Sequence, residues 1–103
     1  MNMKAEKRRR LAAAGWKETT VQEFLNLSEA DVQYIEMKLA LSRLLRLVRE
    51  RRRLTQTKAA ALLKTSQSRL ARMEAGDPSV SLDLLVRGLF ALGASPRDLL
   101  KAA

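Results

Sequence analysis

The sequence predicts an all-α protein. Hydrophobic residues make up 47% of the chain but aromatic residues only 4%, and Leu and Ala dominate, which is typical of helices around an aliphatic core. Residues that cap helices recur along the chain, each ahead of an apolar pattern of helical spacing. No run alternates apolar and polar residues as a half-buried strand would. The 103 residues suit one compact domain rather than two.

The longest expected helix covers residues 29–53, where neither Pro nor Gly interrupts the chain. Ser28 can cap its start, and Asp31 suits the first turn. The pattern predicts one continuous helix of about 23 residues, roughly 35 Å long. One apolar row consists of Tyr34, Met37, Leu41, Leu44 and Val48, and a second row of Val32, Ile35 and Leu39. A helix that is apolar on two sides needs two covers. The second cover is either the preceding segment or another subunit, and the sequence leaves both open.

Four shorter helices are expected after this one. Each follows a hydroxyl side chain that can accept a hydrogen bond from the first turn. The caps and helices are Thr55 for 56–63, Ser66 for 67–75, Ser81 for 82–92, and Ser95 for a last helix from Pro96. Gly76 and Gly93 are expected to end the second and third of these. Ser95 and Asp98 have capping-box spacing, and Leu99 and Leu100 are expected to close the core.

The charge of the chain favours a polyanionic partner. Twenty Lys and Arg against eleven Asp and Glu give a net charge of +9 and a pI near 10.9, which points to nucleic acid or an anionic membrane. Residues 43–76 hold most of the excess. A membrane is the poorer candidate, because residues 49–53 lack the aromatic face of a surface helix and no segment has the roughly 20 apolar residues of a spanning helix.

The chain contains no His and no Cys. Thiol nucleophiles, disulfides, His-based acid–base catalysis and the usual zinc sites are therefore excluded. No close pair of carboxylates stands beside an expected pocket. We expect neither an enzyme nor a metal or other cofactor.

Residues 56–75 predict a helix-turn-helix unit, in which the second helix enters the DNA major groove. Small residues at 59–61 allow the helices to approach, and Leu63, Leu70 and Met73 are spaced to bury the inner side. The residues left pointing outward near the start of the second helix are Gln67, Ser68, Arg69 and Arg72. Gln pairs with adenine, Arg with guanine, and Ser with base edges or phosphate. The pattern indicates a surface that reads DNA.

The residues of this helix pair follow a known pattern. They combine Leu-Thr-Gln at positions 54–56 with Gln67, Glu74 and Gly76. In these residues the chain resembles the Cro/C1 (Xre) family of phage and bacterial repressors, and the likeness extends over about residues 41–101. The resemblance implies a five-helix, lambda-repressor-like DNA-binding domain in residues 41–103.

The resemblance also implies roles for single residues. Gln56 would brace Gln67 and touch phosphate, while Gln67 would read a base. Glu74 would pair with Arg49 and hold the recognition helix on the first helix. The DNA-binding residues predicted from residue types and resemblance together are Gln56, Thr57, Lys58, Lys64, Ser66, Gln67, Ser68, Arg69 and Arg72.

Arg53 and Lys64 depart from the family pattern, which usually has Gly at both positions. Each should occupy, or avoid, a left-handed conformation that costs an L-residue roughly 1–2 kcal/mol. Positive charge near a helix C-terminus offsets part of that cost. Both side chains become candidate phosphate contacts.

The residues before the domain form two expected segments. Residues 1–18 are expected to be a basic, partly mobile arm, and residues 19–40 a helical extension that leads into the long helix and includes a short helix from Thr20 to about Asn26. Trp16 and residues 20–25 and 35–37 resemble the extension of antitoxin-type members, including HigA-like proteins. There the extension binds a small ribonuclease toxin or forms the dimer; the alternative is that it only completes the core.

These observations predict a sequence-specific DNA-binding transcriptional regulator. We expect a repressor that binds an inverted repeat in double-stranded DNA as a homodimer. The alternative is the antitoxin of a type II toxin-antitoxin pair, which neutralises a small toxin protein by binding it and autoregulates its operon. The resemblance implies a bacterial, cytoplasmic and nucleoid-associated protein.

Overall fold

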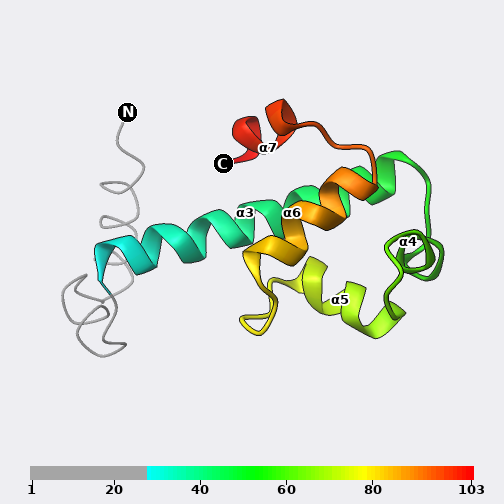
Figure 1. Cartoon of the computed structure of the whole chain (residues 1–103), viewed down its shortest axis with the longest axis horizontal. Coiled ribbons are helices and arrows are strands. Elements are labelled where there is room, and N and C mark those ends of the chain that lie inside the picture. Colours follow the sequence, from blue (N-terminus) through cyan, green and yellow to red (C-terminus); the bar gives the residue numbers. More distant parts are fainter. Residues whose placement is uncertain (1–27) are drawn as a thin grey trace, which may run out of the picture. The chain divides into compact units, whose positions relative to one another are not determined.

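A computed structural model describes residues 28–103 of the chain (Figure 1). These residues form α3 (Glu29–Arg51), α4 (Gln56–Leu62), α5 (Gln67–Ala75), α6 (Leu82–Ala91) and α7 (Pro96–Ala102), with no strand among them. The all-α prediction is confirmed over this range. The basic arm predicted for residues 1–18 and the short helix predicted from Thr20 to about Asn26 lie outside the described residues.

The chain divides into two compact units after Gln33. Residues 28–33, the described part of the first unit, form the cap and first turn of α3. The Ser28 hydroxyl accepts a hydrogen bond from the Asp31 N–H at 3.1 Å, and the Asp31 carboxylate accepts one from the Ser28 N–H at 3.2 Å. The cap predicted at Ser28 is therefore present, with Glu29 and Asp31 at the positive end of the helix dipole.

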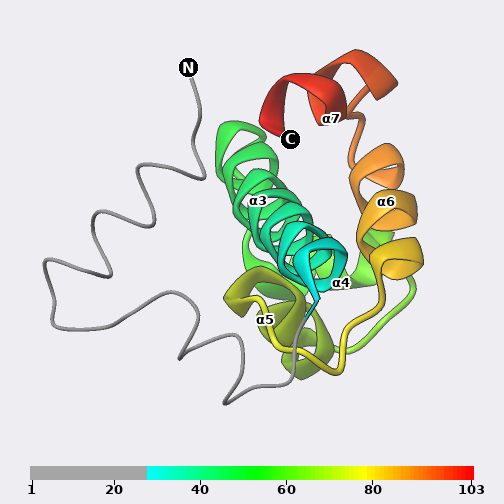
Figure 2. The same cartoon turned by 90° about the vertical axis from the view of Figure 1, so that its left-hand side faces the viewer.

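The second unit, Tyr34–Ala103, packs around one aliphatic core. Figure 2 looks nearly along α3 and shows α5 on one side of it and α7 on the other. Leu45, Leu70 and Leu89, from α3, α5 and α6, are fully buried. Burying a side chain of this size stabilises the fold by about 1.5–3 kcal/mol. The remaining buried apolar residues are Leu41, Ala59, Ala60, Met73, Val80, Leu85, Leu92 and Ala94.

The predicted caps determine where the short helices begin. In each case the hydroxyl of the cap residue accepts a hydrogen bond from the N–H three residues on, as Ser66 does from Arg69 at 3.1 Å. Ser95 and Asp98 form the predicted capping box, with Pro96 at the start of α7. The observed helices α3, α4 and α6 end one or two residues before the predicted limits, because the residues that follow each of them form a turn.

The expectation that both Leu99 and Leu100 close the core is wrong for Leu100. Leu99 packs against the core, whereas Leu100 is 79% exposed. Consecutive residues of a helix point about 100° apart, so a helix of two turns that lies against the core on one side buries only one of them.

The apolar row of α3 is buried only from Leu41 onward. Leu41 and Leu45 are buried and Leu44 and Val48 pack on the core, while Tyr34 and Met37 are close to half exposed. In Figure 1 the other helices of the second unit lie beside the later part of α3 rather than beside its cyan first turns.

Candidate nucleic-acid interface

Helices α4 and α5 form the predicted helix-turn-helix unit (Figure 1). Ala59 and Ala60 of α4 are buried, and so are Leu70 and Met73 of α5. Ala61 is exposed, so two of the three alanines provide the small side chains that let the helices approach. The inner side of the pair is apolar, as the spacing predicted.

The turn between α4 and α5 is left-handed at Lys64. This residue has a φ of 56°, and the Thr65 N–H donates to the Ala60 carbonyl at 2.9 Å while the Lys64 N–H donates to the Ala61 carbonyl at 3.2 Å. This pair of hydrogen bonds is the Schellman closure of a helix. Of the two outcomes expected for Lys64, the structure therefore shows the left-handed conformation rather than its avoidance.

The end of α3 has the same closure at Arg53. Its φ is also 56°, and the Leu54 N–H donates to the Arg49 carbonyl at 3.1 Å. Gly76 and Gly93 occupy the corresponding positions after α5 and α6. The four helix ends share one geometry, and at two of them a cation replaces the glycine near the negative end of the helix dipole.

The outer side of α5 is polar and exposed. Gln67, Ser68, Arg69 and Arg72 are all exposed, whereas Leu70 and Met73 face the core with 1% exposure or less. No acidic residue lies in the first turn. The predicted outward projection of the four side chains is confirmed; their contacts to DNA remain predictions.

An ion pair joins α5 to α3. Arg49 Nε donates to Glu74 Oε2 at 2.6 Å, and Arg49 Nη2 donates to Glu74 Oε1 at 3.0 Å. The two side chains are 13% and 4% exposed. The hydrogen bond to Glu74 raises the pKa of Arg49, so the guanidinium stays charged. The structural pair implied by the resemblance is present.

The ion pair continues into a chain of hydrogen bonds that ends at the exposed start of α5. Gln56 Nε2 donates to Glu74 Oε1 at 3.2 Å, and Gln67 Nε2 donates to Gln56 Oε1 at 2.7 Å. The brace between Gln56 and Gln67 was implied by the resemblance. The contact between Gln56 and Glu74 was missed, because nothing in their spacing of 18 residues signals it.

Side chains predicted to contact phosphate are exposed in α4 and in the turn before α5. Thr57 and Lys58 are exposed in the first turn of α4, directly after Gln56, whose side chain reaches Gln67. Lys64 is exposed in the turn, and Ser66 caps α5 with a hydroxyl that lies 3.3 Å from that of Ser68. Of the residues predicted to bind DNA, the structure brings Gln56 to Gln67 and Ser66 to Ser68, and the others are exposed.

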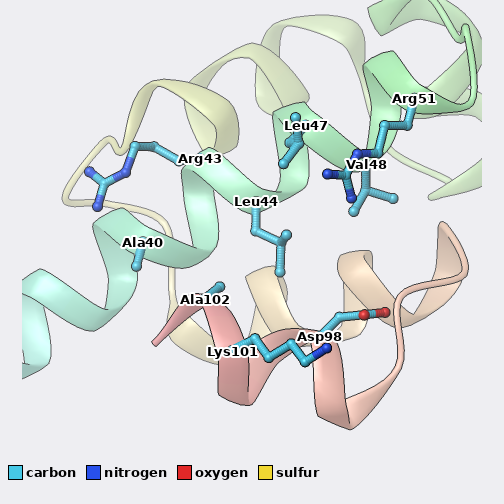
Figure 3. A pocket seen from close by; sticks show the side chains of 9 residues that line it. All are labelled: Ala40, Arg43, Leu44, Leu47, Val48, Arg51, Asp98, Lys101 and Ala102. Carbon is cyan, nitrogen blue, oxygen red and sulfur yellow. The ribbon is translucent and has the colours of Figure 1, made fainter.

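A groove between α3 and α7 is separate from this surface (Figure 3). Figures 1 and 2 both show α7 and α5 on opposite sides of α3, so the groove faces away from the recognition helix. Leu44 and Val48 point into it from α3. Its lining consists of Ala40, Arg43, Leu44, Leu47, Val48, Arg51, Asp98, Lys101 and Ala102.

Comparison with known proteins identifies the same region. Residues 40–103 match the family model of a helix-turn-helix domain. No curated protein and no solved structure matches the chain. Among the described residues, no helix has the length and apolar character needed to cross a bilayer. Since the match covers more than half of the chain and includes both α4 and α5, the chain belongs to the helix-turn-helix domain family, with an all-helical fold of the Cro/C1 type.

Proposed function

We propose that the protein is a sequence-specific transcriptional regulator that represses by occupying DNA. The observation that carries the proposal is the exposed polar face of α5, mounted on buried Leu70 and Met73 and tied to α3 through Glu74. A helix held in this way presents its side chains to the major groove without further ordering. Membership of the helix-turn-helix family supports DNA binding.

The exposed side chains match the groups that DNA offers. Gln67 suits adenine, Arg69 and Arg72 suit guanine, and Ser68 suits base edges or phosphate. Lys58 and Lys64, with Thr57, suit the phosphate backbone that flanks the groove. The proposal needs no catalytic step and no cofactor, and it assigns the protein to bacterial cytoplasm, on nucleoid DNA.

The proposed binding unit is a homodimer on an inverted repeat. A single α5 reads only a few base pairs, and two copies related by a two-fold axis read two half-sites. The half-sites lie about one turn of the duplex apart, roughly 34 Å, because both recognition helices face the same side of the DNA.

Selection of bound duplexes from a random pool tests this function. The expected product is an inverted repeat with half-sites about one helical turn apart. The variant Arg69→Ala with Arg72→Ala should lose the enrichment, and the matched control, Arg46→Ala with Arg87→Ala, removes the same charge from exposed pairs elsewhere and should keep it. Failure of the wild type to enrich any sequence contradicts the proposal.

The antitoxin role is a second candidate, favoured by one observation. In the part of α3 before residue 40, four large apolar side chains are 38% to 47% exposed, namely Tyr34, Ile35, Met37 and Leu39. They precede residue 40, where the family match begins, and several large exposed apolar side chains on one short segment are typical of a protein-binding region. Co-purification with the product of a neighbouring short reading frame tests this role. Loss of the complex in Tyr34→Ala with Met37→Ala would support it, and absence of any complex would contradict it.

A further inference from the structure

We infer that Glu74 is a positioning residue for base selection, which fixes the amide of Gln67 in the orientation that accepts adenine and rejects guanine. The inference rests on the proposed DNA-reading function and adds a determinant of specificity that does not touch DNA. It follows from the direction of the hydrogen bonds between Glu74, Gln56 and Gln67.

The direction of these bonds is imposed by Glu74. An ionised carboxylate only accepts hydrogen bonds, whereas a glutamine amide donates at one end and accepts at the other. Gln56 must therefore turn its NH₂ group to Glu74, at 3.2 Å, and its oxygen to Gln67. Gln67 must in turn present its NH₂ group, at 2.7 Å. Reversal of either amide would oppose two acceptors or two donors.

Glu74 is itself immobilised. Its side chain is 4% exposed, and both oxygens accept hydrogen bonds from Arg49, at 2.6 and 3.0 Å. Arg49 is held from its other side, because its Nη1 donates to the Leu54 carbonyl at 2.9 Å. The chain thus starts at a fixed, buried acceptor and ends at an exposed amide, whose orientation water alone would leave free.

The fixed orientation decides which base edge fits. One of the two Gln67 Nε2 hydrogens is taken by Gln56. The other hydrogen and the Gln67 oxygen remain, one donor beside one acceptor. Adenine offers the complement in the major groove, with acceptor N7 and donor N6, whereas guanine offers two acceptors, N7 and O6. A freely turning amide could offer both NH₂ hydrogens to guanine; the held amide cannot.

The test compares two duplexes that differ only at the base pair read by Gln67, one with guanine there and one with adenine. The measured quantity is the ratio of their dissociation constants. That base pair is identified as the one at which Gln67→Ala abolishes discrimination. The wild type should prefer adenine by roughly tenfold or more. Glu74→Gln places a reversible amide beside Gln56 and should reduce the preference several-fold. Gln56→Ala leaves the pair of Arg49 and Glu74 intact and should also reduce the adenine preference. This variant provides the test if Glu74→Gln does not fold.

A swapped pair separates positioning from simple structural support. In Glu74→Gln with Gln56→Glu, an acceptor-only carboxylate stands beside Gln67 in place of the Gln56 oxygen, and the amide at position 74 can donate to it. The adenine preference should return, although the new charge near phosphate weakens binding to every duplex. An unchanged ratio in Gln56→Ala, or a swapped pair that binds without regaining the preference, overturns the inference. Absence of specific binding by the wild type would instead reject the proposed function.

Discussion

Arg49 and Glu74 lie on different helices, 25 residues apart, and are joined by two hydrogen bonds of 2.6 and 3.0 Å. The pair connects α3, the helix that runs through the core, to the recognition helix α5. Because Arg49 also binds the Leu54 carbonyl, it ties the end of α3 to the chain that leads into α4. The orientation of the recognition surface therefore depends on a contact remote from its exposed face.

Arg49→Ala should destabilise the fold strongly, because it leaves the Glu74 charge buried without its partner. The expected loss is about 3 kcal/mol, measured as the free energy of unfolding in urea. The exposed pair of Asp83 and Arg87, whose side chains are 73% and 78% exposed, provides the comparison. Arg87→Ala should change stability little. If the two variants lose the same free energy of unfolding, the buried pair does not stabilise the fold more than an exposed pair does.

Lys64→Gly should change stability and DNA affinity in opposite directions. Lys64 holds a φ of 56°, which glycine adopts without strain, so stability should rise by up to about 1 kcal/mol after the entropic cost of glycine. Affinity should fall, because the proposed phosphate contact is lost. Lys64→Ala is the matched control: it loses the charge but keeps the strained backbone. A thermal melt showing Lys64→Gly below wild type would contradict this account of the turn.

DNA affinity should depend strongly on salt. If each subunit makes three to five phosphate contacts, the logarithm of the dimer's association constant should fall with the logarithm of salt concentration at a slope of roughly −5 to −9. Fluorescence anisotropy across a salt series measures the slope. A slope near zero would exclude an electrostatic contribution from the basic residues around α5.

The capping box of α7 should make stability sensitive to acid. The hydrogen bond from the Ser95 N–H, at 2.8 Å, lowers the pKa of Asp98 below its ordinary value of 3.8. A carboxyl group with a lowered pKa in the folded state stabilises the fold above that ordinary value, and the contribution is lost as the pH falls through the folded pKa. The difference in unfolding free energy between wild type and Asp98→Asn should therefore be constant above about pH 5 and shrink below 3.8. A difference that persists undiminished to the lowest pH would contradict the lowered pKa.

The helix starts could be predicted because their signals are local. The hydroxyls of Thr55, Ser66, Ser81 and Ser95 each bond an N–H three residues away, so the sequence contains both partners within one turn. The exposure of the α5 surface was predictable for a related reason. Once Leu70 and Met73 face inward, the helical repeat leaves Gln67 and Arg69 outside.

Features that depend on packing between distant segments could be predicted less well from the sequence. The pairing of Arg49 with Glu74 followed from resemblance to a family, since spacing alone does not bring α3 and α5 together. The hydrogen bond between Gln56 and Glu74 and the exposure of Leu100 depend on how short helices rotate against the core. Capping patterns do not encode that rotation.

The most direct test of the central claim, that the outer face of α5 reads bases, compares Gln67→Ala with Lys58→Ala. Both variants are assayed on the selected duplex and on all its single-base-pair substitutions. Gln67→Ala should lose about 1–3 kcal/mol of discrimination at one base pair of each half-site, whereas Lys58→Ala should weaken binding to all duplexes alike. If the two variants weaken every duplex equally, α5 is not the element that reads sequence.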